Sequence, residues 1–153
     1  MTSRMEMIAF ESFHIGQESN FGSYLVTKAE ILEFAKKYDP QFFHLDPEAA
    51  KFSLFGGLCA SGWHTCAMTM AMIVENMKGK GSSLGSPGVD ELRWLKPVYP
   101  GETLSVRTVV TDTIPSKSRP EVGVIVQKVT VVNQDSVPVL SFISNGFFPR
   151  TQT

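Results

Sequence analysis

Residues 61–77 are apolar on nearly every side when drawn as an α-helix, and this restricts the folds open to the chain. The apolar side chains are Trp63, Cys66, Ala67, Met68, Met70, Ala71, Met72, Ile73, Val74 and Met77. A helix that is apolar all round is a buried helix. Ser61 can cap its start, and Lys78-Gly79 suits its end. Such a helix needs cover on several sides, so either a sheet wraps around it, or a partner subunit contributes, or both.

The second half of the chain has the patterns of β-strands. We expect strands at 91–98, 104–111, 122–132 and 137–148. Apolar and polar residues alternate over 104–111, and β-branched residues dominate 122–132. Gly79–Gly88 is rich in Gly and Ser and is expected to be a loop, while Pro100-Gly101 suits a type II turn. Consecutive strands with short connections form antiparallel sheets. The sequence therefore predicts an α+β fold, with the long helix packed on a strongly twisted antiparallel sheet.

Two shorter helices are predicted in the first half, after an extended stretch at 22–26. Thr27-Lys28-Ala29-Glu30 matches a capping box, and apolar residues follow it at helical spacing. Pro40 ends this helix, because the residue before a proline disfavours the α conformation. Asp46-Pro47 then provides an N-cap and a proline at the first helical position, so a short helix is expected to run to about Lys51.

Length and composition define the broad class of protein. The 153 residues are enough for one domain, 1–153, and the net charge of −1 gives no electrostatic case for nucleic acid. The longest apolar segment, Ala67–Val74, is too short to span a membrane. Met1–Phe10 lacks a signal pattern, so we expect a cytoplasmic protein. Cys59 and Cys66 have no metal-ligand or CxxC spacing and are expected to be small apolar core residues in a reduced protein.

One short segment carries the residues best suited to chemistry. Asp39 and His44 are five residues apart, and Pro40 forbids a continuous helix between them, so the segment is expected to be a loop. A loop can turn both side chains toward one water, where an imidazole accepts and returns a proton beside a carboxylate. The alternative is a helix-capping Asp and a surface His. Phe42 and Phe43 beside the pair indicate that the loop lies against a core or a ligand tunnel.

The start of the long helix is a second candidate site. Free N–H groups and the helix dipole favour negative charge there, and Gly62 has no side chain to keep a ligand from its backbone N–H. A carbonyl oxygen at this point would be polarised as in an oxyanion hole. The alternative is that Gly62 only permits close packing. His64, in the first turn, is expected to hydrogen-bond a neighbour, and His14 to be a surface side chain.

Several segments also carry a resemblance to a known family. They are Phe34–Ala50, Phe55-Gly56, Ser61-Gly62, Arg93–Leu104 and Arg119–Gly123. Together they resemble the MaoC-like dehydratases, which include the (R)-specific enoyl-CoA hydratases. The most specific part is Asp-x4-His followed by Leu-Asp-Pro. Two places differ from the usual family pattern: Gln41 and Phe42 replace Asn and Pro, and Ser61 replaces a His before the Gly.

The resemblance implies a single hot-dog domain, in which an antiparallel sheet wraps around a long helix, usually as a homodimer or a dimer of dimers. It implies hydration of a trans-2-enoyl-CoA to an (R)-3-hydroxyacyl-CoA, or the reverse dehydration, as in fatty acid metabolism. Asp39 and His44 would activate water, and Ser61 and the Gly62 N–H would bind the thioester group at its carbonyl oxygen. The acyl-pocket candidates are Phe42, Phe43 and Trp63. Acyl-CoA would be the partner, with no metal, cofactor, nucleic acid or membrane.

Two other functions are compatible with the same fold. An acyl-CoA thioesterase commonly uses an acid on or near the long helix, but here the helix has none before Glu75 near its far end. A non-catalytic acyl-CoA-binding subunit is the other alternative, since hot-dog domains also serve as members of larger assemblies.

Overall fold

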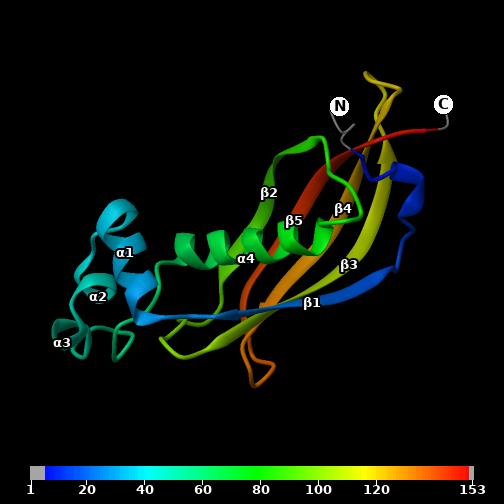
Figure 1. The fold of residues 1–153 in the computed structure, drawn as a ribbon. Helices are drawn as coiled ribbons and strands as arrows, with labels where there is room; N and C mark the ends of the chain where they lie inside the picture. Colours follow the sequence, from blue (N-terminus) through cyan, green and yellow to red (C-terminus); the bar gives the residue numbers. More distant parts are fainter. Residues whose placement is uncertain (1–5, 152–153) are drawn as a thin grey trace, which may run out of the picture.

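The chain forms a five-stranded antiparallel sheet with one long helix across it (Figure 1). The computed structural model describes residues 6–151, so the first five residues of Met1–Phe10 lie outside it. The strands are β1 (Glu18–Leu25), β2 (Gly85–Trp94), β3 (Thr103–Pro115), β4 (Val122–Val132) and β5 (Pro138–Pro149). The helices are η1 (Phe10–Ser12, 3-10), α1 (Lys28–Tyr38), α2 (Phe42–Leu45), α3 (Pro47–Ala50) and α4 (Gly62–Met77). The sheet order is β1-β3-β4-β5-β2, which confirms the α+β class and the hot-dog arrangement.

The predicted boundaries of one strand are wrong. Instead of 91–98, β2 spans Gly85–Trp94, so the second part of the expected loop at 79–88 is strand. Among residues 6–151, β2 is an edge strand that pairs with β5 alone, and its register shifts twice. An edge strand tolerates proline and glycine because one of its sides makes no ladder hydrogen bonds. This explains why the loop-like residues before Val89 are still part of a sheet.

Helix α4 lies across one face of the sheet, and only one of its sides is buried (Figure 1). The buried side carries His64, Thr65, Met68, Thr69 and Met72. Trp63, Met70 and Val74 are each at least half exposed. The expectation that the helix is buried all round is therefore wrong for a single chain, because one sheet covers one face. The exposed side leaves room for the second expected source of cover, a partner subunit.

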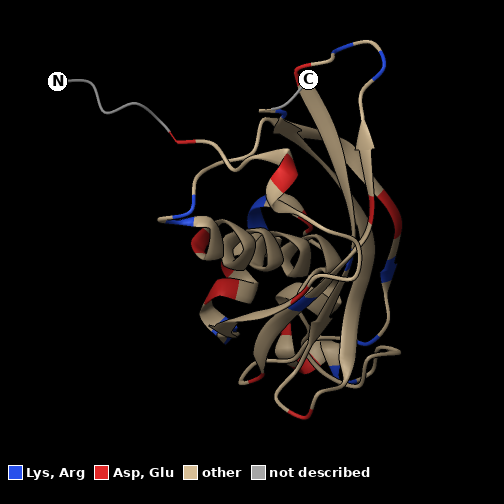
Figure 2. Ribbon diagram, turned by 90° about the vertical axis from the view of Figure 1, so that its right-hand side faces the viewer, with Lys and Arg blue, Asp and Glu red and all other residues tan. Residues whose placement is uncertain are grey.

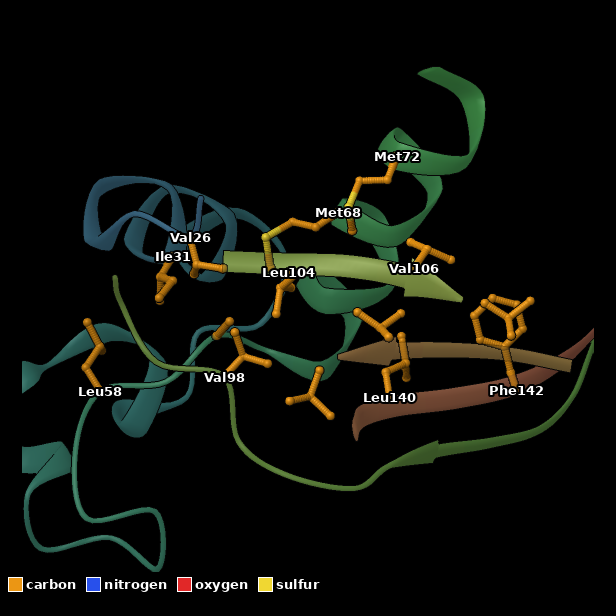
Figure 3. Packing of buried hydrophobic residues seen from close by; sticks show 14 of the residues in the cluster. Val26, Ile31, Leu58, Met68, Met72, Val98, Leu104, Val106, Leu140 and Phe142 are labelled. Carbon is orange, nitrogen blue, oxygen red and sulfur yellow. The ribbon is translucent and has the colours of Figure 1, made fainter. Parts of the chain in front are cut away.

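The main core fills the space between α4 and the sheet (Figure 3). Met68 and Met72 of α4 meet Leu104 and Val106 of β3 and Leu140 of β5 in this cluster. Burial of aliphatic side chains of this size stabilises the fold by roughly 1.5–3 kcal/mol each. The core thus fixes α4 on the sheet and, with it, the position of the helix N-terminus.

Helices α1, α2 and α3 gather beside the N-terminal end of α4 (Figure 1). The starts of α1 and α3 are capped: Thr27 accepts a hydrogen bond from the Glu30 N–H, and Asp46 accepts from Glu48 and Ala49, whereas α2 has no side-chain cap. The second half of the predicted capping box is wrong, because the Glu30 carboxylate bonds Tyr24 and His64 instead. Pro40 follows the end of α1, but the chain re-enters a helix at once in α2, where a plain loop was expected. The three helices thereby hold the segment between Asp39 and His44 in one place.

Charged residues are dispersed over the fold. Figure 2 shows acidic and basic positions interspersed along the helices, strands and turns of the described chain. Within residues 6–151, no helix combines the length and the apolar character needed to cross a bilayer.

Candidate functional site

The structure brings Asp39 and His44 together. Asp39 caps the C-terminus of α1, and His44 lies on α2. The Nε2 atom of His44 is 3.5 Å from Oδ2 of Asp39, and the side chains are 7% and 17% exposed. This separation is longer than a strong hydrogen bond. It is suited to a water that contacts both groups.

The other nitrogen of His44 is held by the backbone. Nδ1 lies 2.7 Å from the carbonyl oxygen of Cys59, which can only accept, so Nδ1 carries the hydrogen. In the neutral imidazole Nε2 is then the basic nitrogen, and it is the one facing Asp39. The sequence did not reveal this bond, because a backbone carbonyl fifteen residues away leaves no motif.

The carboxylate of Asp39 has a donor on each oxygen. The Ser61 hydroxyl donates to Oδ2 at 2.7 Å, and the Gln41 amide donates to Oδ1 at 2.8 Å. Burial raises the pKa of Asp39, but the bonds from Ser61 and Gln41 and the field of His44 outweigh it, so the pKa is lowered. Asp39 therefore stays ionised near neutral pH. Gln41, which departs from the family pattern, still positions the carboxylate.

Ser61 has a second role at the same point. Its hydroxyl oxygen accepts a hydrogen bond from the Trp63 N–H at 3.3 Å and so caps α4, as the sequence predicted. The bond to Asp39 was not predicted. One side chain therefore joins the end of α1 to the start of α4.

Gly62 lies under an aromatic ring. A Cβ atom here would overlap the indole of Trp94, so the missing side chain does permit close packing. Trp94 in turn packs edge-on against Trp63, with ring centroids 5.1 Å apart. The N–H of Gly62 is still at the first position of α4, where no earlier helical turn accepts it. Packing and anion stabilisation are compatible at this glycine.

The three predicted acyl-pocket residues do not form one wall. Phe42 and Phe43 line a cavity of about 420 Å³ with Phe52, Ser53, Leu54 and Phe55. Trp63 lies against Trp94 instead, on the exposed side of α4. A second cavity, of about 340 Å³, includes Tyr38 and His64 in its wall. The two cavities thus involve the direct chain neighbours of Asp39 and His44, although neither wall includes these two residues.

The remaining candidate residues are Cys59, which contacts His44, and the two other histidines. Burial raises the pKa of the Cys59 thiol to about 11, so it is protonated and unsuited to nucleophilic attack. His64 hydrogen-bonds Glu30, which confirms the expectation of a bonded neighbour. His14 is exposed, as expected. Among residues 6–151, no three His, Cys, Asp or Glu side chains gather as a candidate metal site.

Comparison with known proteins gives consistent matches. The family model described as "MaoC like domain" matches residues 11–133. The chain is 31% identical to the uncharacterized protein YdeM of Bacillus subtilis over 84% of this chain and 90% of that protein. The crystal structure of a MaoC-like dehydratase from Rhodospirillum rubrum is 38% identical, with a TM-score of 0.86, and the match covers 95% of this chain and 99% of that chain.

A more distant neighbour shares the fold. The R-hydratase PhaJ1 from Pseudomonas aeruginosa superposes with a TM-score of 0.72 at 21% identity, over 97% of this chain and 90% of that chain. The family match covers most of the chain, and the resemblance noted from Asp39, His44 and the segments around them is thereby confirmed. The chain belongs to the MaoC-like domain family.

Proposed function

We propose that this chain adds water to a trans-2-enoyl-CoA to give an (R)-3-hydroxyacyl-CoA, or removes water in the reverse direction. The MaoC-like family and the neighbour named an R-hydratase support a hydratase or dehydratase role. The observation that carries the proposal is the 3.5 Å separation between His44 Nε2 and Asp39 Oδ2 beside the start of α4. A basic nitrogen and an ionised carboxylate then face the same point.

In the proposed reaction one water bridges the pair. Asp39 accepts a hydrogen bond from one O–H of the water and orients it, and that hydrogen stays on the oxygen. His44 Nε2 takes the other proton as the water oxygen bonds to C3 of the enoyl group. The electrons of the double bond move toward the thioester oxygen, where the Gly62 N–H and the dipole of α4 stabilise the charge. The protonated His44 then returns its proton to C2. Water is added overall, and His44 and Asp39 end in their starting states.

The test follows the absorbance of the conjugated enoyl thioester. The protein should abolish this absorbance with a short trans-2-enoyl-CoA, and Asp39→Asn and His44→Gln should each lower the rate by about 10²–10⁴-fold. Matched controls are Asp112→Asn and His14→Gln, which change an exposed Asp and an exposed His. Activity that survives both changes at the proposed pair would falsify the assignment.

Two further measurements, thiol release and acyl-CoA binding, separate the alternatives. A thioesterase would release free thiol from a saturated acyl-CoA, whereas a hydratase releases none. Glu75, the only acid on α4, is exposed near the end of the helix remote from Asp39. A non-catalytic subunit would bind acyl-CoA tightly and turn over no enoyl-CoA. Neither alternative makes use of the paired Asp39 and His44.

We also propose that two copies associate through β2 and α4. β2 is a sheet edge, and Val89 on it is nearly half exposed. The contact between Trp63 and Trp94 makes this edge continuous with the exposed side of α4, which includes Met70. Sedimentation analysis should show a dimer for the natural protein and a monomer for Met70→Glu. Ile15→Glu, at an exposed apolar residue before β1, is the control and should remain dimeric.

A further inference from the structure

A second carboxylate–imidazole pair lies outside the proposed catalytic site. Oε1 of Glu30 accepts a hydrogen bond from the Tyr24 hydroxyl at 2.5 Å and lies 3.1 Å from Nε2 of His64. The three residues come from β1, α1 and α4. The bond from Tyr24 lowers the pKa of Glu30, burial raises it, and His64 lowers it further, with a net decrease. Glu30 is therefore ionised, and His64 donates to it through Nε2–H.

His64 is an unusual residue to find at this depth. His64 is 3% exposed, and its ring stacks on Phe34 with centroids 4.7 Å apart and planes 9° from parallel. Its Nδ1 atom has no hydrogen-bond partner among residues 6–151. A buried polar atom without a partner costs free energy, and an apolar side chain at this position would avoid that cost. The structure thus keeps a polar group where packing alone does not require one.

These residues form part of a cavity wall. The cavity has a volume of about 340 Å³ and is lined by Tyr24, Glu30, Glu33, Phe34, Lys37, Tyr38, His64, Ala67 and Met68. Both hydrogen bonds to Glu30 go to Oε1, and within the described chain none reaches Oε2. The Glu30 side chain is 42% exposed. A small ligand in the cavity therefore has an ionised carboxylate oxygen available to it.

The cavity is close to the proposed reaction. Tyr38 in its wall is the residue before Asp39, and Ser61, which bonds Asp39, is three residues before His64. Ser61 is the N-cap of α4 and His64 lies in its first turn, so the Asp39 contact and His64 both lie at the start of α4. An acyl group with its reacting carbons beside Asp39 and His44 would have this cavity within reach of its far end.

We propose, on the basis of the hydration activity proposed above, that the cavity receives the far end of the acyl group and selects acyl groups with a hydroxyl there over plain hydrocarbon. A hydroxyl can donate to Oε2 of Glu30, whereas a hydrocarbon would remove water from that carboxylate without replacing the lost hydrogen bond.

The experiment compares matched ligands of graded chain length. Each pair consists of a saturated acyl-CoA and the acyl-CoA of equal chain length with a terminal hydroxyl, and calorimetry gives the Kd of each. At the chain length that brings the terminal hydroxyl to Oε2 of Glu30, the hydroxyl ligand should bind about 10- to 100-fold more tightly than the saturated ligand of equal length. This factor is expected for a hydrogen bond to a charged group. The corresponding trans-2-enoyl-CoA pairs are then compared by kcat/KM.

Three variants locate the source of the preference. Glu30→Gln removes the charge with little change of shape, and His64→Leu makes the wall apolar; both should bring the two ligands close to equal affinity. Glu33→Gln is the matched control, because Glu33 lies on the same wall, is exposed and makes no bond to Tyr24 or His64. It should keep the preference. If His64→Leu does not fold, Glu30→Gln and the natural protein still decide the question.

The outcomes separate this inference from the proposed activity. Equal or weaker binding of the hydroxyl ligand at every length overturns the selection, even if alkyl enoyl-CoA substrates are hydrated. A preference that Glu30→Gln leaves unchanged overturns the role of this carboxylate. A preference in binding that Glu30→Gln removes, without turnover of any enoyl-CoA, supports the cavity as a recognition site and contradicts the hydratase.

Discussion

The imidazole of His44 is held by the backbone of Cys59, with Nδ1 2.7 Å from the carbonyl oxygen. The carbonyl is itself fixed in place, because the Cys59 N–H bonds to the Phe43 oxygen and the next residue, Ala60, bonds to Val98. The Cys59 Sγ atom also lies 3.8 Å from Nδ1, but the carbonyl contact is much the shorter of the two. The tautomer of His44 therefore depends chiefly on the path of the chain rather than on the side chain at position 59.

Replacing Cys59 by Ala should leave the proposed hydration intact. The carbonyl that holds His44 remains, and the protonated thiol is not needed, so kcat/KM should stay within about twofold. Loss of one buried sulfur should lower the free energy of unfolding by about 1–2 kcal/mol. Enoyl-thioester absorbance and urea unfolding measure the two effects. A folded Cys59→Ala protein without activity would instead give the thiol a chemical role.

Replacing Ser61 by Ala should affect both stability and catalysis. The change removes the cap of α4 and one donor to Asp39, so the free energy of unfolding should fall by about 1 kcal/mol. Thr27→Ala removes the cap of α1 without touching Asp39 and should have a similar effect on stability alone. Only Ser61→Ala should lower the hydration rate.

The pH dependence of Ser61→Ala gives a further readout. The pKa of Asp39 is lowered in the folded protein partly by the Ser61 bond, and the ionised form is the one that orients water. In Ser61→Ala the pKa of Asp39 should rise, and carboxyl NMR titration of Asp39 measures it directly. The acid limb of kcat/KM does not isolate Asp39, because the mechanism also needs His44 unprotonated. An unmoved Asp39 pKa would show that Ser61 acts only as a helix cap.

Tyr24 should be among the last tyrosines to titrate. Its bond to Glu30, burial and the Glu30 charge raise its pKa from 10.0 to about 12. Because the folded pKa is above the unfolded value, the associated stability is complete below pH 10 and is lost as the pH rises through about 12. Tyrosinate absorbance should show one fewer late-titrating group in Tyr24→Phe. Glu30→Gln should return Tyr24 toward its ordinary range.

Gly62→Ala, which adds one methyl group, should destabilise the protein. The new Cβ would overlap the Trp94 indole, and overpacking of this kind costs about 1–3 kcal/mol. Trp94→Ala should remove the clash, so the double variant should lose less stability than the sum of the two single changes. Chemical denaturation of all four proteins gives the coupling. Strict additivity would mean that the two residues do not compete for the same space.

Local patterns in the sequence predicted much of the architecture and the central pair. Capping residues and Pro40 placed α1 and α4 because their effects act within a few residues. The same proline indicated that Asp39 and His44 lie off a continuous helix, and the structure brings them together. β2 was misplaced because an edge strand follows sheet pairing rather than local propensity.

The polar contacts around the pair could not be predicted in the same way. Ser61 meets Asp39 across 22 residues, and His64 meets Glu30 across 34. Such pairs depend on how α1 docks against α4, which no local spacing encodes. The position of Trp63 against Trp94 was not foreseen for a related reason: an apolar helix gives no sign of which side faces the sheet and which side faces Trp94.

The hydroxyl of Ser61 has an evolutionary consequence, because it begins a helix and holds an acid with the same oxygen. Selection for a well-folded chain alone would preserve it in a descendant that no longer met any substrate. Part of the reactive geometry would then persist without use, available to another ligand.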